Sequence, residues 1–148
     1  MNRIIIIVLS IFLISCEKNG LNSQDEIEFQ AGKFPQKWEL VKMSGMVANE
    51  PPTEGNDMDW QESYVLKADG AFIKSRVSNE ETAIVTGLYK IVKLEDGEYL
   101  KLSHESFSDI IGNCTNSSEE YLRFESVNSL IGTWWACDGP GLFYGRTQ

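Results

Sequence analysis

The chain lacks the residues and motifs on which most enzyme active sites depend. Its 148 residues include one histidine, His104, and three cysteines. A zinc site of three histidines is therefore excluded. The patterns G-x-x-x-x-G-K-[ST], G-x-S-x-G and G-x-G-x-x-G do not occur either, which argues against nucleotide-binding loops and nucleophile elbows. We predict a protein that is not an enzyme and that uses no cofactor and no metal.

Two local clusters of polar residues could suggest chemistry, but neither has the required pattern. Ser103 and Glu105 flank His104, and neighbours on a strand point to opposite faces, so the three cannot form a catalytic triad. We expect His104 to be an exposed residue at a strand end. Acids crowd the segment Gly45–Trp60 without the alternating order of a calcium loop, so we expect solvated side chains. These acids are Glu54, Asp57 and Asp59.

Positive charge is scarce. Lys and Arg number 13 against 22 Asp and Glu, and the net charge is −9. Nucleic-acid binding needs clustered Lys and Arg, so the composition argues against it. It also argues against electrostatic attraction to an anionic bilayer.

The chain has no apolar run long enough for a permanent membrane span, which needs about 20 residues. The run Ile4–Ile14, interrupted only by Ser10, follows Arg3, and this order is typical of an export signal. Leu13-Ile14-Ser15-Cys16 resembles the bacterial lipoprotein signal. The resemblance implies cleavage before Cys16 and a diacylglycerol on its thiol. The alternative is an ordinary signal peptide in which Cys16 has no special role.

Lipidation of Cys16 would divide the chain into three parts. Residues 1–15 would be the signal peptide, residues 16–32 a polar, flexible tether that carries the lipid on Cys16, and residues 33–148 one domain. Two or more acyl chains anchor a protein stably. We therefore expect a monomer in the bacterial cell envelope, held by Cys16 and placed at the outer membrane.

With Cys16 used for lipid, Cys114 and Cys137 remain as a pair. Such a pair is normally oxidised outside the cytosol, so we predict a disulfide. On the chain-entropy model the bridge would stabilise the fold by roughly 3 kcal/mol. Two free buried thiols are the alternative.

Short runs rich in Val, Ile, Tyr, Phe and Trp, each bounded by Gly, Pro, Asn or Asp, predict strands. Eight runs have this character: Lys37–Ser44, Gln61–Lys67, Ala71–Ser78, Thr82–Lys93, Glu98–His104, Glu119–Glu125, Ser129–Ala136 and Gly141–Arg146. Tight turns such as Ala68-Asp69-Gly70 join several of them. We predict an all-β fold, an eight-stranded antiparallel up-and-down barrel, with a strongly coiled sheet as the alternative.

Period-two alternation predicts which side chains face the interior. The clearest inward sets are Tyr64 with Leu66, Gly87 with Tyr89 and Ile91, Leu100 with Leu102, and Leu122 with Phe124. The strand Ala71–Ser78 is ambiguous. If Phe72 faces inward, Lys74 and Arg76 follow it, whereas the opposite face offers Ala71, Ile73 and Val77.

Several segments together resemble the lipocalin-like lipoproteins of Bacteroidetes. They are Lys37-Trp38-Glu39-Leu40, Ala68-Asp69-Gly70-Ala71-Phe72, Gly87-Leu88-Tyr89 and the closing stretch 136–146. The resemblance implies a calycin-type barrel in which Trp38 lies under Arg146. Gln36 stands where the family usually has glycine, two places before the Trp, so the match to true lipocalins is weaker than the match to the barrel.

Two functions fit such a barrel. It could bind a small, mainly apolar ligand at its mouth, with Gly45–Trp60 at the rim, and this is the function that we expect. The alternative is a filled barrel that acts as a protein-interaction module of the envelope. Residue size bears on the choice: Gly87, Gly132 and Gly145 would open space, while Tyr89, Phe124 and Trp134 would fill it. We expect Trp134 to face inward in phase with Leu130.

Overall fold

The computed structural model describes residues 29, 33–45 and 50–148. The predicted signal peptide, Cys16 and the predicted tether other than Phe29 lie outside the described residues. In the described ranges, no helix has the length and apolar character needed to cross a bilayer.

Strands dominate the described part of the chain. In chain order, its elements are β1 (Gln36–Ser44), β2 (Thr53–Glu54), the 3-10 helix η1 (Gly55–Asp57), β3 (Gln61–Leu66), β4 (Ala71–Ser78), β5 (Glu81–Leu94), β6 (Gly97–His104), β7 (Glu119–Ser126), β8 (Ser129–Gly132), the 3-10 helix η2 (Trp134–Cys137) and β9 (Gly141–Arg146).

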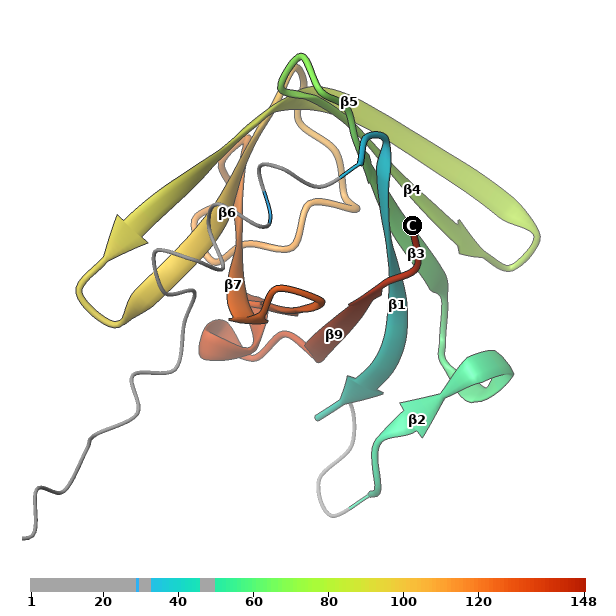
Figure 1. Cartoon of the computed structure of the whole chain (residues 1–148). Coiled ribbons are helices and arrows are strands. Elements are labelled where there is room, and N and C mark those ends of the chain that lie inside the picture. Colours follow the sequence, from blue (N-terminus) through green and yellow to red (C-terminus); the bar gives the residue numbers. More distant parts are fainter. Residues whose placement is uncertain (1–28, 30–32, 46–49) are drawn as a thin grey trace, which may run out of the picture.

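The sheet closes on itself. Each of the strands β3 to β8 pairs with the next, β1 pairs with β3, and β1 also pairs with β9. The β1–β9 ladder runs from Trp38 opposite Arg146 to Ser44 opposite Gly141, with a bulge between Leu40 and Lys42. All of these pairings are antiparallel, so the predicted eight-stranded up-and-down barrel is confirmed (Figure 1). The short β2 is an additional strand on β1.

The two ends of the barrel differ in their connections. Three tight turns, at 67–70, 95–96 and 127–128, lie at what we call the hairpin end. The connections 45–60, 79–80, 105–118 and 133–140 lie at the opposite end, which we call the loop end. At the first tight turn Gly70 has a φ of 86°, and Ala71 N donates to Asp69 Oδ1 over 3.1 Å, as that turn sequence predicts.

The prediction for Ser129–Ala136 was wrong in its second half. Strand β8 ends at Gly132, and η2 follows. Thr133 has helical dihedrals (φ −92°, ψ −1°) and bonds Tyr121 O through both its N and its Oγ1. These contacts turn the chain out of the sheet and override the strand propensity of two tryptophans. Trp134 packs against the core as expected, but it does so from a helical turn, while Trp135 is 58% exposed.

The longest strand, β5, bends across the top of the view in Figure 1 and belongs to hairpins on both sides. Gly87 lies near its middle. A Cβ at Gly87 would be 2.1 Å from Ser103 O and 2.7 Å from the Phe72 ring. Only glycine therefore allows β5 to approach β6 and the core this closely.

The apolar core extends along the barrel and includes three aromatic side chains at the hairpin end. Trp38, Phe124 and Phe29 are buried there, and the rings of Phe29 and Phe124 meet edge to face at 5.3 Å. Gln36 Nε2 also donates to Phe29 O over 3.0 Å. The core thus includes a residue from before the first strand, within the segment predicted as a tether.

Candidate functional site

Five charged or titratable side chains point into the loop-end half of the barrel. They are Glu62 on β3, Lys74 and Arg76 on β4, His104 on β6 and Glu120 on β7. On β4, Phe72 is buried, so the inward phase of this strand carries Lys74 and Arg76 with it. This resolves the ambiguity that the sequence left at Ala71–Ser78.

Lys74 lies at the centre of this group, which we call the charge cluster. Its side chain is 0% exposed. The ammonium is 2.9 and 3.1 Å from the two carboxylate oxygens of Glu120 and 3.2 Å from Glu62 Oε1. A buried cation needs such partners, because removing it from water costs several kcal/mol in order of magnitude, roughly as much as its pairing returns.

Glu62 connects the cluster to the edge of the loop end. It accepts hydrogen bonds from the Tyr144 hydroxyl over 2.6 Å and from Arg76 Nε. The Arg76 guanidinium lies 4.4 Å from the centre of the Trp60 ring, and its Nη2 donates to Ile110 O over 3.1 Å. Arg76 therefore ties β4 both to β3 and to the loop 105–118.

Glu120 is held from two further sides. Gly112 N donates to Oε1 over 3.0 Å, and His104 Nε2 lies 3.1 Å from Oε2. Counted with Lys74, both oxygens of Glu120 have partners, as do both oxygens of Glu62. Two carboxylates thus face two cations, with His104 beside them. All four carboxylate oxygens have partners, whereas Nδ1 of His104 is buried without one among the described residues.

The cluster changes the acidity of its members. Burial by itself would raise the pKa of Glu120, but the Lys74 ammonium and the hydrogen bond to His104 outweigh it and lower the pKa from 4.5 to about 2. Burial, together with the carboxylates of Glu62 and Glu120, holds the pKa of Tyr64 and of Tyr144 well above 10.0. The Glu120 carboxylate is thus kept ionised, and the two phenols are kept neutral, so their hydroxyls serve as donors.

The expectation for His104 was wrong, because its side chain is buried. It packs edge to face on Phe72 at 5.0 Å and faces Glu120. The signal was present in the sequence: His104 continues the inward phase of Leu100 and Leu102. In the same way Glu62 continues that of Tyr64, and Glu120 that of Leu122. Extending each alternation by one step would have identified the cluster.

The other residues singled out in the sequence lie elsewhere. Cys114 and Cys137 are joined at the loop end, with Sγ atoms 2.06 Å apart, as the pairing predicted. Trp38 lies opposite Arg146 in the β1–β9 ladder at the hairpin end, where Arg146 Nε donates to Gln148 O over 3.2 Å. Stacking of this guanidinium on the indole stays a prediction.

The acids of the loop 45–60 do not form a metal site in the part of the chain that the structure describes. Glu54, Asp57 and Asp59 are exposed there, as expected for solvated side chains. Among the described residues, no three His, Cys, Asp or Glu side chains gather in the way that metal ligands do.

Two hollows lie on the outer wall of the described part of the barrel. One, of about 560 Å³, lies beside η2 and β9, and another, of about 490 Å³, lies along β1 and β9. The interior positions are instead occupied by large buried side chains of the barrel, among them Trp38, Tyr64, Tyr144 and Lys74.

Comparison with other proteins adds no assignment: no protein-family model, curated protein or solved structure matches this chain.

Proposed function

We propose that the protein is a lipid-anchored, non-catalytic lipoprotein of the bacterial cell envelope, related to the lipocalin-like lipoproteins, whose barrel is filled and acts as an interaction module through its outer surface. The observation that carries this proposal is the occupied interior. Its apolar half is packed with Phe29, Trp38 and Phe124, and its polar half with the charge cluster.

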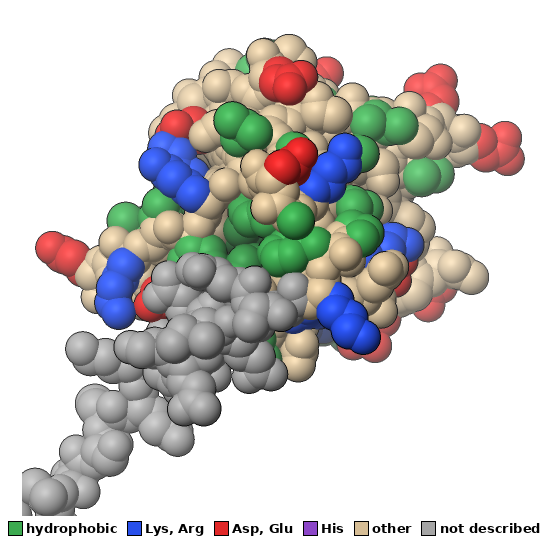
Figure 2. Space-filling view, turned by 45° about the horizontal axis from the view of Figure 1, so that its top comes forward, with side chains coloured by type: hydrophobic (Ala, Val, Ile, Leu, Met, Phe, Trp, Pro, Cys, Tyr) green, Lys and Arg blue, Asp and Glu red, His purple; other side chains and the backbone are tan. Residues whose placement is uncertain are grey.

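The charge cluster makes the interior costly to open. A ligand entering the loop-end half would have to separate Lys74 from two carboxylates or leave one of them unpaired. Removing one partner of a buried ion pair costs about 3–5 kcal/mol. The outer wall, by contrast, offers apolar side chains at no such cost. Ile84 and Leu88 on β5 are 63% and 64% exposed, and Figure 2 shows a face on which hydrophobic side chains gather between charged ones.

A small apolar ligand within the barrel is the second candidate, and one observation favours it. Phe29 precedes the first strand, and its ring packs against both Trp38 and Phe124. Withdrawal of this ring would open an apolar space of the size of one aromatic group at the hairpin end.

Titration with a fluorescent fatty acid, cis-parinaric acid, separates the two candidates. The protein used starts at residue 16 and carries Cys16→Ser, so that it is soluble without lipid. We expect no saturable binding by this chain. A lipocalin that binds fatty acids is the positive control for the assay, and Phe29→Ala tests whether removal of the ring opens the hairpin end to the ligand. Saturable binding by the chain with Phe29 intact would reject the filled barrel and support the apolar ligand.

The anchor is tested in cells by changing Cys16→Ser. We expect the protein to move from the membrane fraction to the soluble fraction, because the thiol is the proposed attachment point. The double variant Cys114→Ser/Cys137→Ser is the matched control and should stay with the membranes. A Cys16→Ser protein that remains uncut and membrane-bound would show that the apolar run itself is the anchor.

The interaction role is tested by placing a photoreactive side chain at Ile84, at Leu88 and at Trp135, one at a time, in the anchored protein. We expect a discrete cross-linked species from at least one position, and its loss when Cys16→Ser is added. If none of the three positions yields an adduct, the outer wall is not an interaction surface.

A further inference from the structure

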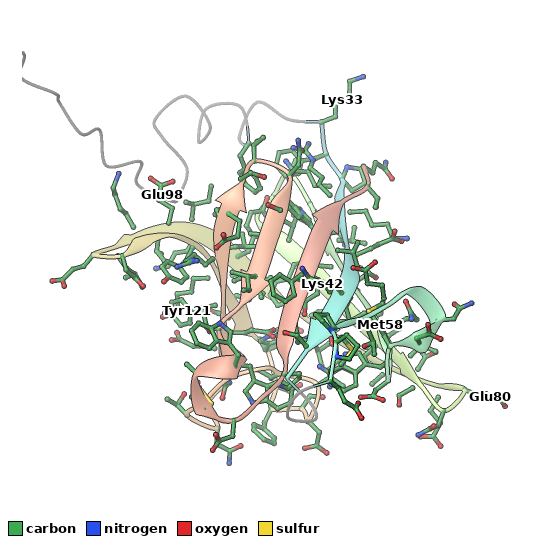
Figure 3. The ribbon with its side chains drawn as sticks, turned by 90° about the horizontal axis from the view of Figure 1, so that it is seen from below. Lys33, Lys42, Met58, Glu80, Glu98 and Tyr121 are labelled. Atoms are coloured by element: carbon green, nitrogen blue, oxygen red, sulfur yellow. A yellow bond between two sulfur atoms is a disulfide. The ribbon has the colours of Figure 1, made fainter. Side chains whose placement is uncertain are left out.

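The hollow of about 560 Å³ on the outer wall combines features that point to a ligand class. It lies at the loop end, between the end of β1, the start of β9 and η2. Figure 3 looks onto this wall, where β8, β9 and β1 lie side by side and Lys42 is labelled. We call this hollow the β9 hollow.

One part of the β9 hollow is apolar. Ile131 and Phe143 face each other across the β8–β9 ladder and line it. Trp135 lines it from η2 and is 58% exposed. Indole rings are usually largely buried in a folded domain. Tryptophan is enriched at binding sites, because one face of the ring can contact a partner while the N–H stays hydrogen-bonded to water.

The other part of the β9 hollow is polar and uncharged except for one carboxylate. Asp138 and Ser44 line it with a carboxylate and a hydroxyl. Asp138 is exposed and takes part in none of the ion pairs between described residues. No Lys or Arg is among the described residues that line the hollow.

The polar and apolar parts are held in fixed relation. Asp138 directly follows Cys137, whose disulfide to Cys114 fixes the end of η2. Gly139 lies so close to the Trp134 ring that a Cβ there would be 2.5 Å from it. The turn that carries Trp135 and Asp138 is therefore held by packing of Gly139 against Trp134 and by the disulfide between Cys137 and Cys114. The site is thus preorganised.

These features exclude most small ligands. An anion would meet the Asp138 carboxylate and no cation, and a metal ion would find too few oxygens. A fatty acyl chain needs an enclosed apolar channel, whereas this hollow is open. A neutral sugar fits, because its ring offers C–H groups to an aromatic face, which is electron-rich. Its hydroxyls at the same time donate to a carboxylate and exchange hydrogen bonds with a hydroxyl.

We propose that the β9 hollow is a binding site for a neutral saccharide, with Trp135 as the stacking platform and Asp138 as the hydrogen-bond acceptor. This inference rests on the proposed function, which assigns interactions to the outer wall of the barrel. It names the ligand of one part of that wall.

The neighbouring hollow extends the site. Its volume is about 490 Å³, and Phe143 lines both hollows. Lys42 Nζ lies 4.2 Å from the centre of the Phe143 ring. A sugar chain of two or more units can therefore contact both, and we expect disaccharides to bind more tightly than the corresponding monosaccharides.

Nuclear magnetic resonance tests the proposal through the indole N–H signals. The soluble chain from residue 16 is titrated with cellobiose, maltose, lactose, mannobiose and N,N′-diacetylchitobiose, each to about 20 mM, which detects dissociation constants in the millimolar range. Trp135→Phe identifies the signal of Trp135, and Trp60→Phe that of Trp60. We expect at least one sugar to shift the Trp135 signal saturably and to leave the Trp60 signal in place.

Variants then test the roles. Trp135→Ala should raise the dissociation constant about tenfold or more, since a good aromatic contact has that order of effect. Asp138→Ala should weaken binding as well. Phe107→Ala is the matched control, because Phe107 is 57% exposed and lies outside the hollow, and it should leave affinity unchanged.

The proposal is overturned if no sugar shifts the Trp135 signal, or if Trp135→Ala binds as tightly as the unaltered chain. Either result would leave the anchor and the filled interior untouched, because those are tested by membrane fractionation and by the fatty-acid titration. Failure of the anchor would conversely leave saccharide binding by the soluble chain intact.

Discussion

Lys74 is the residue on which the interior of the barrel depends most. Its ammonium lies between Glu62 and Glu120, and all three side chains are at most 1% exposed. Its position follows from an alternation that Phe72 fixes, so a core aromatic forces a cation inward. The carboxylates of Glu62 on β3 and Glu120 on β7 neutralise this buried cation. Their ion pairs with Lys74 also link strands that are far apart in the sequence.

Changing Lys74→Met tests this dependence. The variant keeps most of the volume, but among the described residues it leaves the buried Glu120 carboxylate without a lysine or arginine partner and Glu62 with Arg76 alone. We therefore expect it to lose roughly 3–5 kcal/mol of unfolding free energy. Urea denaturation monitored by tryptophan fluorescence measures the change. Lys37→Met is the control, since Lys37 and its partner Glu39 are both 42% exposed, and it should change stability by less than about 1 kcal/mol. If both variants lowered the free energy of unfolding by the same amount, the charge cluster would contribute no more to stability than an exposed ion pair.

Gly87 is the second residue whose identity the packing dictates. A methyl group there would overlap Ser103 O and the Phe72 ring, so we expect Gly87→Ala to destabilise the fold by about 1–3 kcal/mol or more. Gly132→Ala is the matched control, because its Cβ would make ordinary contacts of 3.5 Å and longer. Thermal unfolding of both variants gives the comparison, and a Gly87→Ala protein as stable as Gly132→Ala would contradict it.

At the scale of the strands, the closing ladder between β1 and β9 matters most. It brings the first long strand against the last and makes Trp38 and Arg146 partners across the ladder. The same contact fixes the hairpin end, where Thr147 N donates to Lys37 O over 2.8 Å. The ends of the described domain are thus secured by one set of contacts.

A double-mutant cycle measures this closure. We expect the losses of stability in Trp38→Ala and Arg146→Ala to be non-additive by at least about 0.5 kcal/mol, because the two residues share a cross-strand contact. A guanidinium stacked on a desolvated indole would increase the coupling to about 2 kcal/mol. Arg123, which pairs with Glu125 on β7, supplies the control, and Arg123→Ala should be additive with Trp38→Ala. Full additivity of the first pair would mean that the two side chains do not interact.

The strands show what the sequence could reveal. Ala71–Ser78 and Gly141–Arg146 agree with the prediction at both ends, because turn residues punctuate the chain there. Strand β8 is shorter than predicted. The residues after it, Trp134–Cys137, favour a strand by local propensity, but they form a helical turn. This turn is held by the contact of Thr133 with Tyr121 and by the disulfide of Cys137 with Cys114. Such contacts between distant segments are invisible to local propensity.

The charge cluster was missed for a related reason. On β4 two faces competed, and the choice between them depended on carboxylates of β3 and β7. The neighbours Ser103 and Glu105 suggest an exposed strand end for His104, whereas the alternation of its strand places the side chain inside. The β9 hollow could not be predicted, because it is formed by an outer face and a turn that the sequence had assigned to a strand.

At the scale of the whole molecule, the cluster links folding to pH. The pKa of Glu120 is lower in the folded state, about 2, than its ordinary value of 4.5. The unfolded chain therefore binds a proton first as the pH falls, and the stability that Glu120 contributes is complete above pH 4.5 and is lost between pH 4.5 and about 2.

We therefore expect the unfolding free energy to fall as the pH drops from 5 to 2, with Glu120 contributing about 3 kcal/mol of the loss in order of magnitude. Urea titrations across this range measure the slope. Glu120→Gln should be less stable at pH 7 and should show a flatter profile below pH 5. Glu80→Gln, in the exposed β4–β5 turn, should reproduce the profile of the unaltered chain. A profile of Glu120→Gln with an unchanged slope would contradict the assignment.

The burial of Phe29 also limits where the domain can stand in the envelope. Phe29 is fixed to the hairpin end, and only 13 positions separate it from Cys16. A chain of that length cannot exceed about 45 Å even when fully extended. With lipid on Cys16, the hairpin end of the barrel therefore stays within about 45 Å of the attachment point. The disulfide and the β9 hollow lie at the opposite end, so the tether allows them to lie farther from the attachment point than any part of the hairpin end.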